Sequence, residues 1–193
     1  MVINRSDLDW ETLDVEKHDV GGFLFDKHED NFNHYLKHQA NIDQANGVKR
    51  TRLLIHNETE ILGFYTSCCS KIRVDHSEAQ SVNGRGDDLY VPALEIPYLA
   101  VDLRYRKHES KIGTLVIDEI LGYAYDLSQE VGCRYVFLQA INEQWLVQWY
   151  WHNGFDVTQI PGNRSDGYTV LMRYAIPQGI ILPEEDIEAE AGI

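Results

Sequence analysis

Apolar and polar positions in the first half of the chain follow two different periods. From about Glu29 to Asp43 the apolar residues recur close to every 3.6 residues, which predicts an amphipathic helix that ends at Asn46-Gly47. Branched and aromatic residues fill Thr51–His56 and Ile61–Val74, on either side of the turn-prone segment Asn57–Glu60. We therefore expect a helix followed by an antiparallel β-hairpin.

The second half of the chain alternates strands and helices. The polar, glycine-containing segment 75–88 predicts a loop. In the apolar run Leu94–Val101, Pro97 cannot donate a ladder hydrogen bond, so the strand should be distorted there. A helix with one apolar face is predicted from about Lys111 to Glu130. The remaining predicted elements are a central strand over Arg134–Ala140, a short helix over Gln144–His152 closed by a left-handed turn at Asn153-Gly154, and a final strand over Tyr168–Ala175.

These elements predict one domain of the α/β (α+β) class over residues 1–176, followed by an acidic tail over residues 177–193. The chain has 193 residues, of which 44% are hydrophobic and 25% charged, as in ordinary globular proteins. No stretch reaches the roughly 18 apolar residues that span a bilayer, and no export signal opens the chain, so we expect a cytoplasmic protein without a membrane partner. Cys68, Cys69 and Cys133 form neither a disulfide framework nor a metal motif.

The formal charge of −14 bears on the class of partner. Affinity for nucleic acids depends on Lys and Arg contacts to phosphates, so this charge disfavours general DNA or RNA binding. Five of the acids lie in the last ten residues, with no basic residue among them, but the rest of the chain is acidic as well.

One short segment reverses the local sign of charge. Arg104–Lys111 holds four Lys or Arg residues in eight positions, between the interrupted strand and the start of the long helix. The unpaired N–H groups and partial positive charge of a helix start favour an anion such as a pyrophosphate. In that case Gly113 would let the backbone approach the anion closely. Alternatively, Gly113 only permits close packing of the helix, and the basic residues form a solvated rim.

Two segments carry a specific resemblance. The run Leu99–Asp102, with the basic loop and Lys111–Leu115 after it, resembles the acetyl-CoA motif of the GNAT superfamily of N-acetyltransferases, and Trp149–Phe155 resembles its second signature. The resemblance implies a GNAT-like, mixed and mostly antiparallel central sheet, with a splayed strand and helices on both faces. Weaker matches from Phe25 to Tyr65 resemble the subgroup that includes toxins of toxin–antitoxin pairs.

The loop departs from the family pattern. It is two residues longer between Val101 and Gly113, Lys111 takes the place of the first motif glycine, and His108 falls where Arg or Gln is expected. Either the loop bulges and Arg106 supplies the cation, or coenzyme binding is weakened.

The resemblance assigns the coenzyme site residue by residue. The pantetheine arm would bond to the main chain of the splayed strand at Leu99 and Val101, on either side of Ala100. The pyrophosphate would lie against amides of the helix start, with Arg106 and Lys107 nearby. The amides are those of Lys111, Ile112, Gly113 and Thr114. Acetyl-CoA is then a co-substrate, and no metal is expected, because the histidines lack metal-ligand spacing.

Two residues are candidates for the chemistry. The resemblance places Tyr150 close to the coenzyme sulfur, as the proton donor to the departing thiolate; alternatively it only packs its helix. Glu95 matches a strand glutamate that serves as base in some members, or it is a solvent-facing acid. We expect direct transfer without an acyl-enzyme.

The acceptor stays open at this stage. An acidic cleft would suit a small-molecule or polypeptide amine, such as a polyamine, an aminoglycoside or a lysine side chain. The subgroup resemblance implies instead a toxin that acetylates aminoacyl-tRNA. Its basic face would consist of Arg50, Arg52, Lys71 and Arg73. The negative net charge of the chain disfavours this alternative, because it repels tRNA. A third alternative is a non-catalytic module that binds acyl-CoA or a protein. The resemblance also allows a homodimer.

Overall fold

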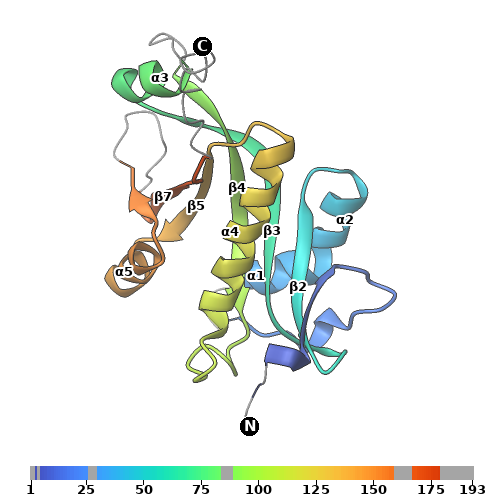
Figure 1. Cartoon of the computed structure of the whole chain (residues 1–193). Helices are drawn as coiled ribbons and strands as arrows, with labels where there is room; N and C mark the ends of the chain where they lie inside the picture. The colour runs from blue at the N-terminus through green and yellow to red at the C-terminus, as the bar shows by residue number, and fades with distance from the viewer. Residues whose placement is uncertain (1–2, 4, 26–29, 84–88, 159–166, 179–193) are drawn as a thin grey trace, which may run out of the picture.

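The computed structural model describes residues 3, 5–25, 30–83, 89–158 and 167–178, and this part of the chain forms one seven-stranded sheet in the order β1-β2-β3-β4-β5-β7-β6 (Figure 1). Neighbouring strands are antiparallel except β4 and β5, which are parallel. The strands are β1 (Leu8–Thr12), β2 (Arg50–His56), β3 (Glu60–Arg73), β4 (Tyr90–Val101), β5 (Tyr135–Ile141), β6 (Asp156–Val157) and β7 (Thr169–Ala175). The predicted mixed, mostly antiparallel sheet is confirmed, whereas most of the predicted tail, from residue 179 on, lies outside the described residues.

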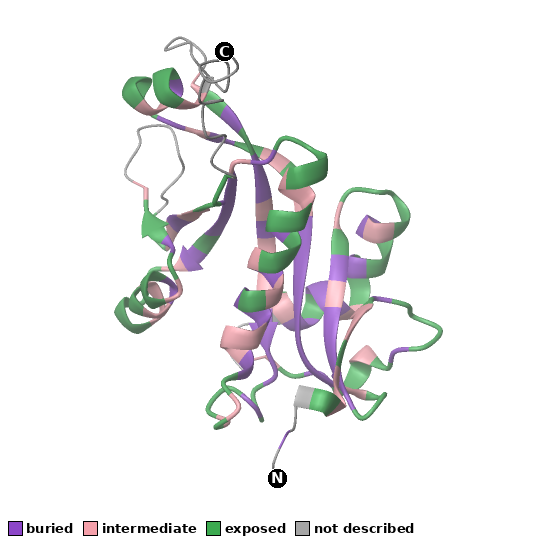
Figure 2. Cartoon of the chain, in the orientation of Figure 1, coloured by how far each residue is buried: buried purple, intermediate pink, exposed green. Residues whose placement is uncertain are grey.

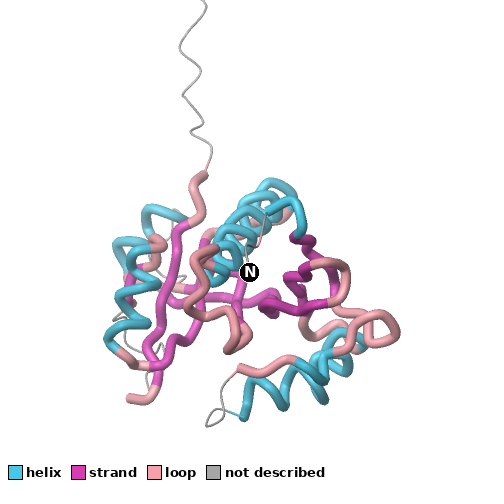
Figure 3. The backbone as a smooth tube through the Cα atoms, turned by 90° about the horizontal axis from the view of Figure 1, so that it is seen from below, coloured by secondary structure: helices cyan, strands magenta, loops and turns pink. Residues whose placement is uncertain are grey.

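Helices cover both faces of the sheet, as predicted (Figures 1 and 3). One face packs against α4 (Ile112–Glu130) and α5 (Gln144–His152), through a core that includes Leu54, Val136 and Tyr150. The other face packs against the helical segment after residue 29 and against α3 (His76–Asn83). Figure 2 shows the middle strands as the buried layer between them. The helical segment is α1 (Asp30–His34), the π-helical η3 (Tyr35–Gln39) and α2 (Ala40–Ala45), and short 3₁₀ turns lie at η1 (Arg5–Asp7) and η2 (Val20–Gly22).

The predicted hairpin is confirmed, but the loop predicted over 75–88 is wrong in its first part. Asn57 and Glu58 take positive φ angles of 49° and 65° in the turn between β2 and β3. Residues 76–83 form α3, because the Asp75 carboxylate accepts a hydrogen bond from the Glu78 N–H at 2.8 Å and so caps the helix. Glu78 in turn binds Arg173 of β7 at 2.9 Å, which fastens α3 to the sheet.

Strand β4 contains the distortion predicted at Pro97. Thr66 pairs with Tyr98 and Cys68 pairs with Glu95, so three steps along β4 match two along β3. The extra residue is a β-bulge, and the Tyr98 N–H beside it donates to the Thr66 hydroxyl at 3.1 Å. Because the bulge shifts the alternation of side chains, Glu95 and Tyr98 both lie on the face away from α4.

Strands β4 and β5 splay apart soon after they meet. Their parallel pairing covers only Ala93 to Glu95 on β4, opposite Tyr135 to Phe137 on β5. The two strands then diverge toward the lower end in Figure 1. Beyond Glu95, β4 pairs with β3 alone within the described residues, so one of its edges is open.

Candidate functional site

The open edge of β4 exposes main-chain groups at two of the predicted residues. The Asp102 N–H donates to the Leu62 carbonyl of β3 at 2.9 Å, and the Tyr98 N–H also points to β3. Main-chain groups of an antiparallel strand point alternately to its two sides. Those of Leu99 and Val101 therefore face the gap, while Ala100 is directed toward β3 and its side chain is buried.

The loop after β4 is a series of tight turns. The N–H groups of Tyr105, His108 and Lys111 donate to the carbonyls three residues earlier, at 2.8, 3.1 and 3.0 Å. These turns shape the longer loop, and the role of Arg106 as its cation stays a prediction. The loop is fixed at its start by Asp102, which the sequence reading had left without a role.

Asp102 is fully buried and holds the loop to the N-terminal segment. Its carboxylate accepts hydrogen bonds from the Leu24 N–H at 3.0 Å, the Arg104 N–H at 2.9 Å and the Arg104 Nε at 2.8 Å. Burial alone would raise the pKa of this carboxyl, but the bonds from Arg104 and Leu24 outweigh burial and hold the pKa below its ordinary value. Arg104 is thus engaged in the scaffold of the loop.

The start of α4 has the geometry of an anion site. Lys111 adopts a left-handed conformation, with φ 49° and ψ 52°, which glycine takes more readily. Within the described part of the chain, the N–H groups of Ile112 and Gly113 have no acceptor, whereas the Lys111 and Thr114 N–H groups bond to the His108 and Lys111 carbonyls. The free amides that follow a left-handed residue form an anion-binding concavity.

The predicted cations differ in their surroundings. The guanidinium of Arg106 lies 4.1 Å from the ring centroid of Phe25, on the N-terminal segment. The side chains of Lys107, in the loop, and Lys111, directly before α4, are exposed. Lys111 directly precedes the free amides, and Lys107 lies in the loop before them.

Tyr150 lies where α5 meets the start of α4. A β-carbon on Gly113 would lie 3.1 Å from the indole of Trp149 and 3.8 Å from the side chain of Val101, so glycine permits this junction. The Tyr150 ring packs 4.8 Å from that of Trp149 and 5.7 Å from that of Phe155, and is 6% exposed. The Tyr150 hydroxyl has no hydrogen-bond partner among the described residues, and burial raises its pKa.

Glu95 reaches the site from the other face of the sheet. It is the last residue of β4 that pairs with β5, it precedes the bulge, and it is half-buried. Its charge, after burial, contributes to the raised pKa of the Cys68 thiol opposite it. Tyr150 belongs to the core on the α4 side, so the two candidate catalytic residues flank the splay from opposite faces.

An aromatic group on the Glu95 face of β4 was not predicted from the sequence. The rings of Tyr35 and Tyr98 stack with centroids 3.8 Å apart and an interplanar angle of 14°, and Phe32 packs edge-on against Tyr98 at 5.6 Å. The helical period over residues 29–43 predicts Phe32 and Tyr35 on one face, but their partner Tyr98 follows only from the bulge.

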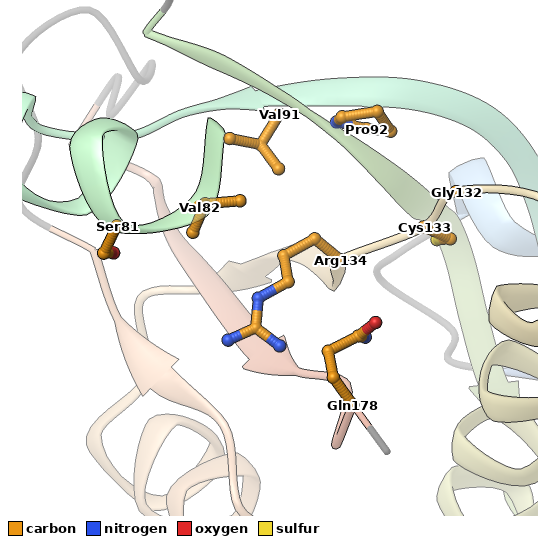
Figure 4. Close-up of a pocket in the computed structure, with 8 residues that line it drawn as sticks. All are labelled: Ser81, Val82, Val91, Pro92, Gly132, Cys133, Arg134 and Gln178. Atoms are coloured by element: carbon orange, nitrogen blue, oxygen red, sulfur yellow. The ribbon is translucent and has the colours of Figure 1, made fainter. Parts of the chain in front are cut away.

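Two other surfaces of the molecule show weaker evidence of a functional site. Arg50, Arg52, Lys71 and Arg73 lie on the α4 side of the β2–β3 hairpin, but Arg52 pairs with Glu119 at 3.2 Å and Lys71 lies 4.4 Å from the Tyr90 ring. An open hollow of about 560 Å³ near the first residues of β5 has Arg134 and Gln178 on its wall (Figure 4). It is at the other end of the sheet from the splay, and we assign it no function.

Two features are absent from the described residues. No group of three or more His, Cys, Asp or Glu residues there is placed to hold a metal ion. No helix there combines the length and apolar character needed to cross a membrane.

Solved structures match the chain in fold. No protein-family model and no curated protein sequence matches it. A tyrosine-to-phenylalanine variant of the toxin AtaT, bound to the C-terminus of the antitoxin AtaR and acetyl-CoA, matches with a TM-score of 0.67 and 20% identity, over 88% of this chain and 94% of that one. A tyrosine-to-phenylalanine variant of KacT matches with a TM-score of 0.70 and 18% identity, over 88% and 95%. AtaT complexed with acetyl-methionyl-tRNAfMet matches with a TM-score of 0.66 and 19% identity, over 86% and 94%. The predicted GNAT-like fold is thereby confirmed.

Proposed function

We propose that this protein is an acetyl-CoA-dependent N-acetyltransferase. The observation that carries the proposal is the junction at Gly113, where the open edge of β4, the free amides of α4 and the Trp149-Tyr150 pair of α5 come together. Fold neighbours that bind acetyl-CoA support it.

The coenzyme would be held mainly by the main chain. The pantetheine amides add to the open edge of β4 at Leu99 and Val101, as a strand would. The pyrophosphate lies against the amides of Ile112 and Gly113, with the ammonium group of Lys107 close by. This arrangement points the thioester toward the bulge, between Tyr150 and Glu95.

Transfer then needs two proton movements. The neutral amine attacks the thioester carbonyl carbon, and the carbon–sulfur bond breaks as the amide bond forms. Glu95 takes the proton that the amine loses, directly or through water, and the Tyr150 hydroxyl gives a proton to the departing thiolate. The raised pKa of Tyr150 keeps that proton available at neutral pH.

A second candidate concerns the acceptor. The amine of a small molecule or polypeptide was expected first, but a fold neighbour complexed with acetyl-methionyl-tRNAfMet favours an aminoacyl-tRNA as acceptor. Both acceptors present an amine to the same thioester, so the catalytic assignment does not depend on the choice.

Calorimetric titration with acetyl-CoA tests the coenzyme site, and an acceptor assay tests the chemistry. We expect micromolar binding that Lys111→Ala weakens. Tyr150→Phe should bind the coenzyme normally but transfer acetyl about 10²- to 10⁴-fold more slowly. Tyr125→Phe, on the exposed side of α4, is the matched control. Absence of binding would contradict the proposal, and binding without transfer or hydrolysis would identify a non-catalytic module.

A further inference from the structure

The first residue of β3, Glu60, lies beside the loop that leads into α4. Gly63 pairs with Val101, the last residue of β4, so the residues of β3 before Gly63 run past the end of β4. The loop folds over this extension, because the Asp102 N–H donates to the Leu62 carbonyl at 2.9 Å. Side chains two residues apart on a strand share a face, so Glu60 lies with Leu62 on the α4 side of the sheet.

The Glu60 carboxylate contacts side chains of the hairpin and of the loop. Its Oε1 atom accepts hydrogen bonds from the Tyr105 hydroxyl and, at 3.3 Å, from Nη1 of Arg104. Nδ1 of the buried His56, the last residue of β2, lies 3.4 Å from Oε2. One carboxylate therefore connects the β2–β3 hairpin to two consecutive residues of the loop.

Tyr105 anchors the middle of the loop in the core. It is buried and belongs to the same cluster as Ile112, the first residue of α4. Burial and the hydrogen bond to Glu60 raise the pKa of the Tyr105 hydroxyl to about 12, so this group remains a donor at neutral pH. The Tyr105 carbonyl accepts from the His108 N–H, and the His108 carbonyl accepts from the Lys111 N–H. Two successive turns thus connect Tyr105 to the left-handed residue that precedes the free amides.

The cluster around Glu60 is not itself suited to hold a phosphate. Glu60 and Asp102 place two carboxylates beside the one guanidinium of Arg104, whose Nε, Nη1 and Nη2 atoms all donate to them. The excess negative charge would repel an anion at close range. An effect of Glu60 on the coenzyme therefore passes through the conformation of the loop.

We propose that Glu60 is a positioning residue for the coenzyme pyrophosphate. Its bonds to Tyr105 and Arg104 hold the loop in the conformation that presents the free amides of α4 before acetyl-CoA arrives. This inference rests on the acetyltransferase function proposed above. Without these bonds the loop adopts other conformations, and the apparent affinity falls with the fraction of molecules that keep the competent one.

Two fragments of the coenzyme separate positioning from a general loss of structure. Adenosine 3′-phosphate 5′-diphosphate carries the pyrophosphate without the pantetheine arm, and S-acetylpantetheine carries the arm and the thioester without the pyrophosphate. In calorimetric titrations, Glu60→Ala and Tyr105→Phe should raise Kd for acetyl-CoA and for the nucleotide about three- to tenfold. Kd for S-acetylpantetheine should stay unchanged, because this fragment does not reach the free amides.

A double variant and two controls test the route of the effect. The bond that Tyr105→Phe removes is already lost in Glu60→Ala, so the double variant should bind acetyl-CoA as Glu60→Ala does. Glu58→Ala removes an exposed acid from the turn of the same hairpin, and Tyr125→Phe removes a hydroxyl from an exposed position of α4. Both controls should bind all three ligands like the wild type. Tyr105→Phe keeps the buried ring, so it decides the test by itself where Glu60→Ala does not fold.

Three results would overturn the inference: an unchanged Kd for the nucleotide in the folded variants, an equal loss of affinity for the nucleotide and for S-acetylpantetheine, or losses that add in the double variant. A failure of the proposed function looks different, because the wild type itself would then not bind acetyl-CoA. Normal binding by the wild type, with no change in either variant, contradicts the positioning role alone.

Discussion

At the scale of single residues, Lys111 combines an unfavourable backbone conformation with a position at the proposed coenzyme site. Its φ of 49° suits glycine. We predict that Lys111→Gly leaves the free energy of unfolding unchanged or raises it by up to about 1 kcal/mol, since relief of strain is partly offset by chain entropy. Lys111→Val should lower it by about 1–3 kcal/mol, because a branched side chain fits this conformation poorly. Denaturant unfolding measures both.

The control is Lys107→Val, at an exposed position with negative φ; equal stability of the two valine variants would contradict the left-handed conformation.

Tyr150 gives a pH prediction at the same scale. Burial raises the pKa of its hydroxyl above the ordinary value of about 10, so the group keeps its proton, and can donate it, throughout the neutral range. We therefore expect no loss of kcat that is due to Tyr150 between about pH 7 and pH 10. The measurement is kcat against pH for the wild type and Tyr150→Phe. An alkaline fall near pH 8 that vanishes in the variant would show that burial does not control this group.

The sequence anticipated residues that belong to local motifs and missed those that depend on tertiary contact. Tyr150 and Gly113 stand in recognisable segments. The packing of Trp149 on Gly113 joins two helices, and the stack of Tyr35 on Tyr98 joins a helix to a strand. No local pattern specifies which of several aromatic residues will meet across the sheet.

At the scale of elements, Asp102 ties the β4–α4 loop to the N-terminal segment. Asp102→Asn should lower the free energy of unfolding by about 2 kcal/mol, because it weakens charge-assisted hydrogen bonds from Leu24 and Arg104 at a buried site. The folded-state pKa of Asp102 is depressed, so its contribution is present above its unfolded-state pKa of about 4 and is lost as the pH falls through the lower folded-state value.

The measurement for Asp102 is unfolding at pH 7 and over pH 2–5. The wild type should lose its advantage over Asp102→Asn in the acid range. Asp118→Asn, at an exposed position of α4, is the control and should track the wild type. A difference between wild type and Asp102→Asn that is the same at pH 7 and at pH 2 would show that the carboxylate charge is not what fixes the loop.

Whole elements were predictable where their signals are local. The periodicity of α4, the Gly154 stop of α5 with φ 87°, and the turn of the hairpin all gave the correct elements. Helix α3 was missed because its polar composition outweighed the capping signal of Asp75. The short edge strands β1 and β6 were missed because they gain their stability from pairing with neighbours rather than from their own composition.

At the scale of the whole molecule, two electrostatic effects would oppose each other at the proposed coenzyme site. The net charge of −14 would repel the phosphates of acetyl-CoA, whereas in the proposed site Lys107 and Lys111 would attract them at short range. Salt screens charges beyond about 10 Å at 0.1 M and beyond about 3 Å at 1 M. The sign of the salt dependence therefore reports which effect dominates.

We predict that the local charges dominate, because Lys111 directly precedes the free amides and Lys107 lies in the loop before them, while most of the acids are distributed over the rest of the chain. The affinity for acetyl-CoA should then fall several-fold between about 0.05 and 0.5 M NaCl. Lys107→Gln should flatten this dependence. Lys71→Gln, at the far end of β3 where the ammonium lies 4.4 Å from the Tyr90 ring, should keep the wild-type slope. An affinity that rises with salt would show that the net charge governs binding, and would contradict the placement of the pyrophosphate against the start of α4.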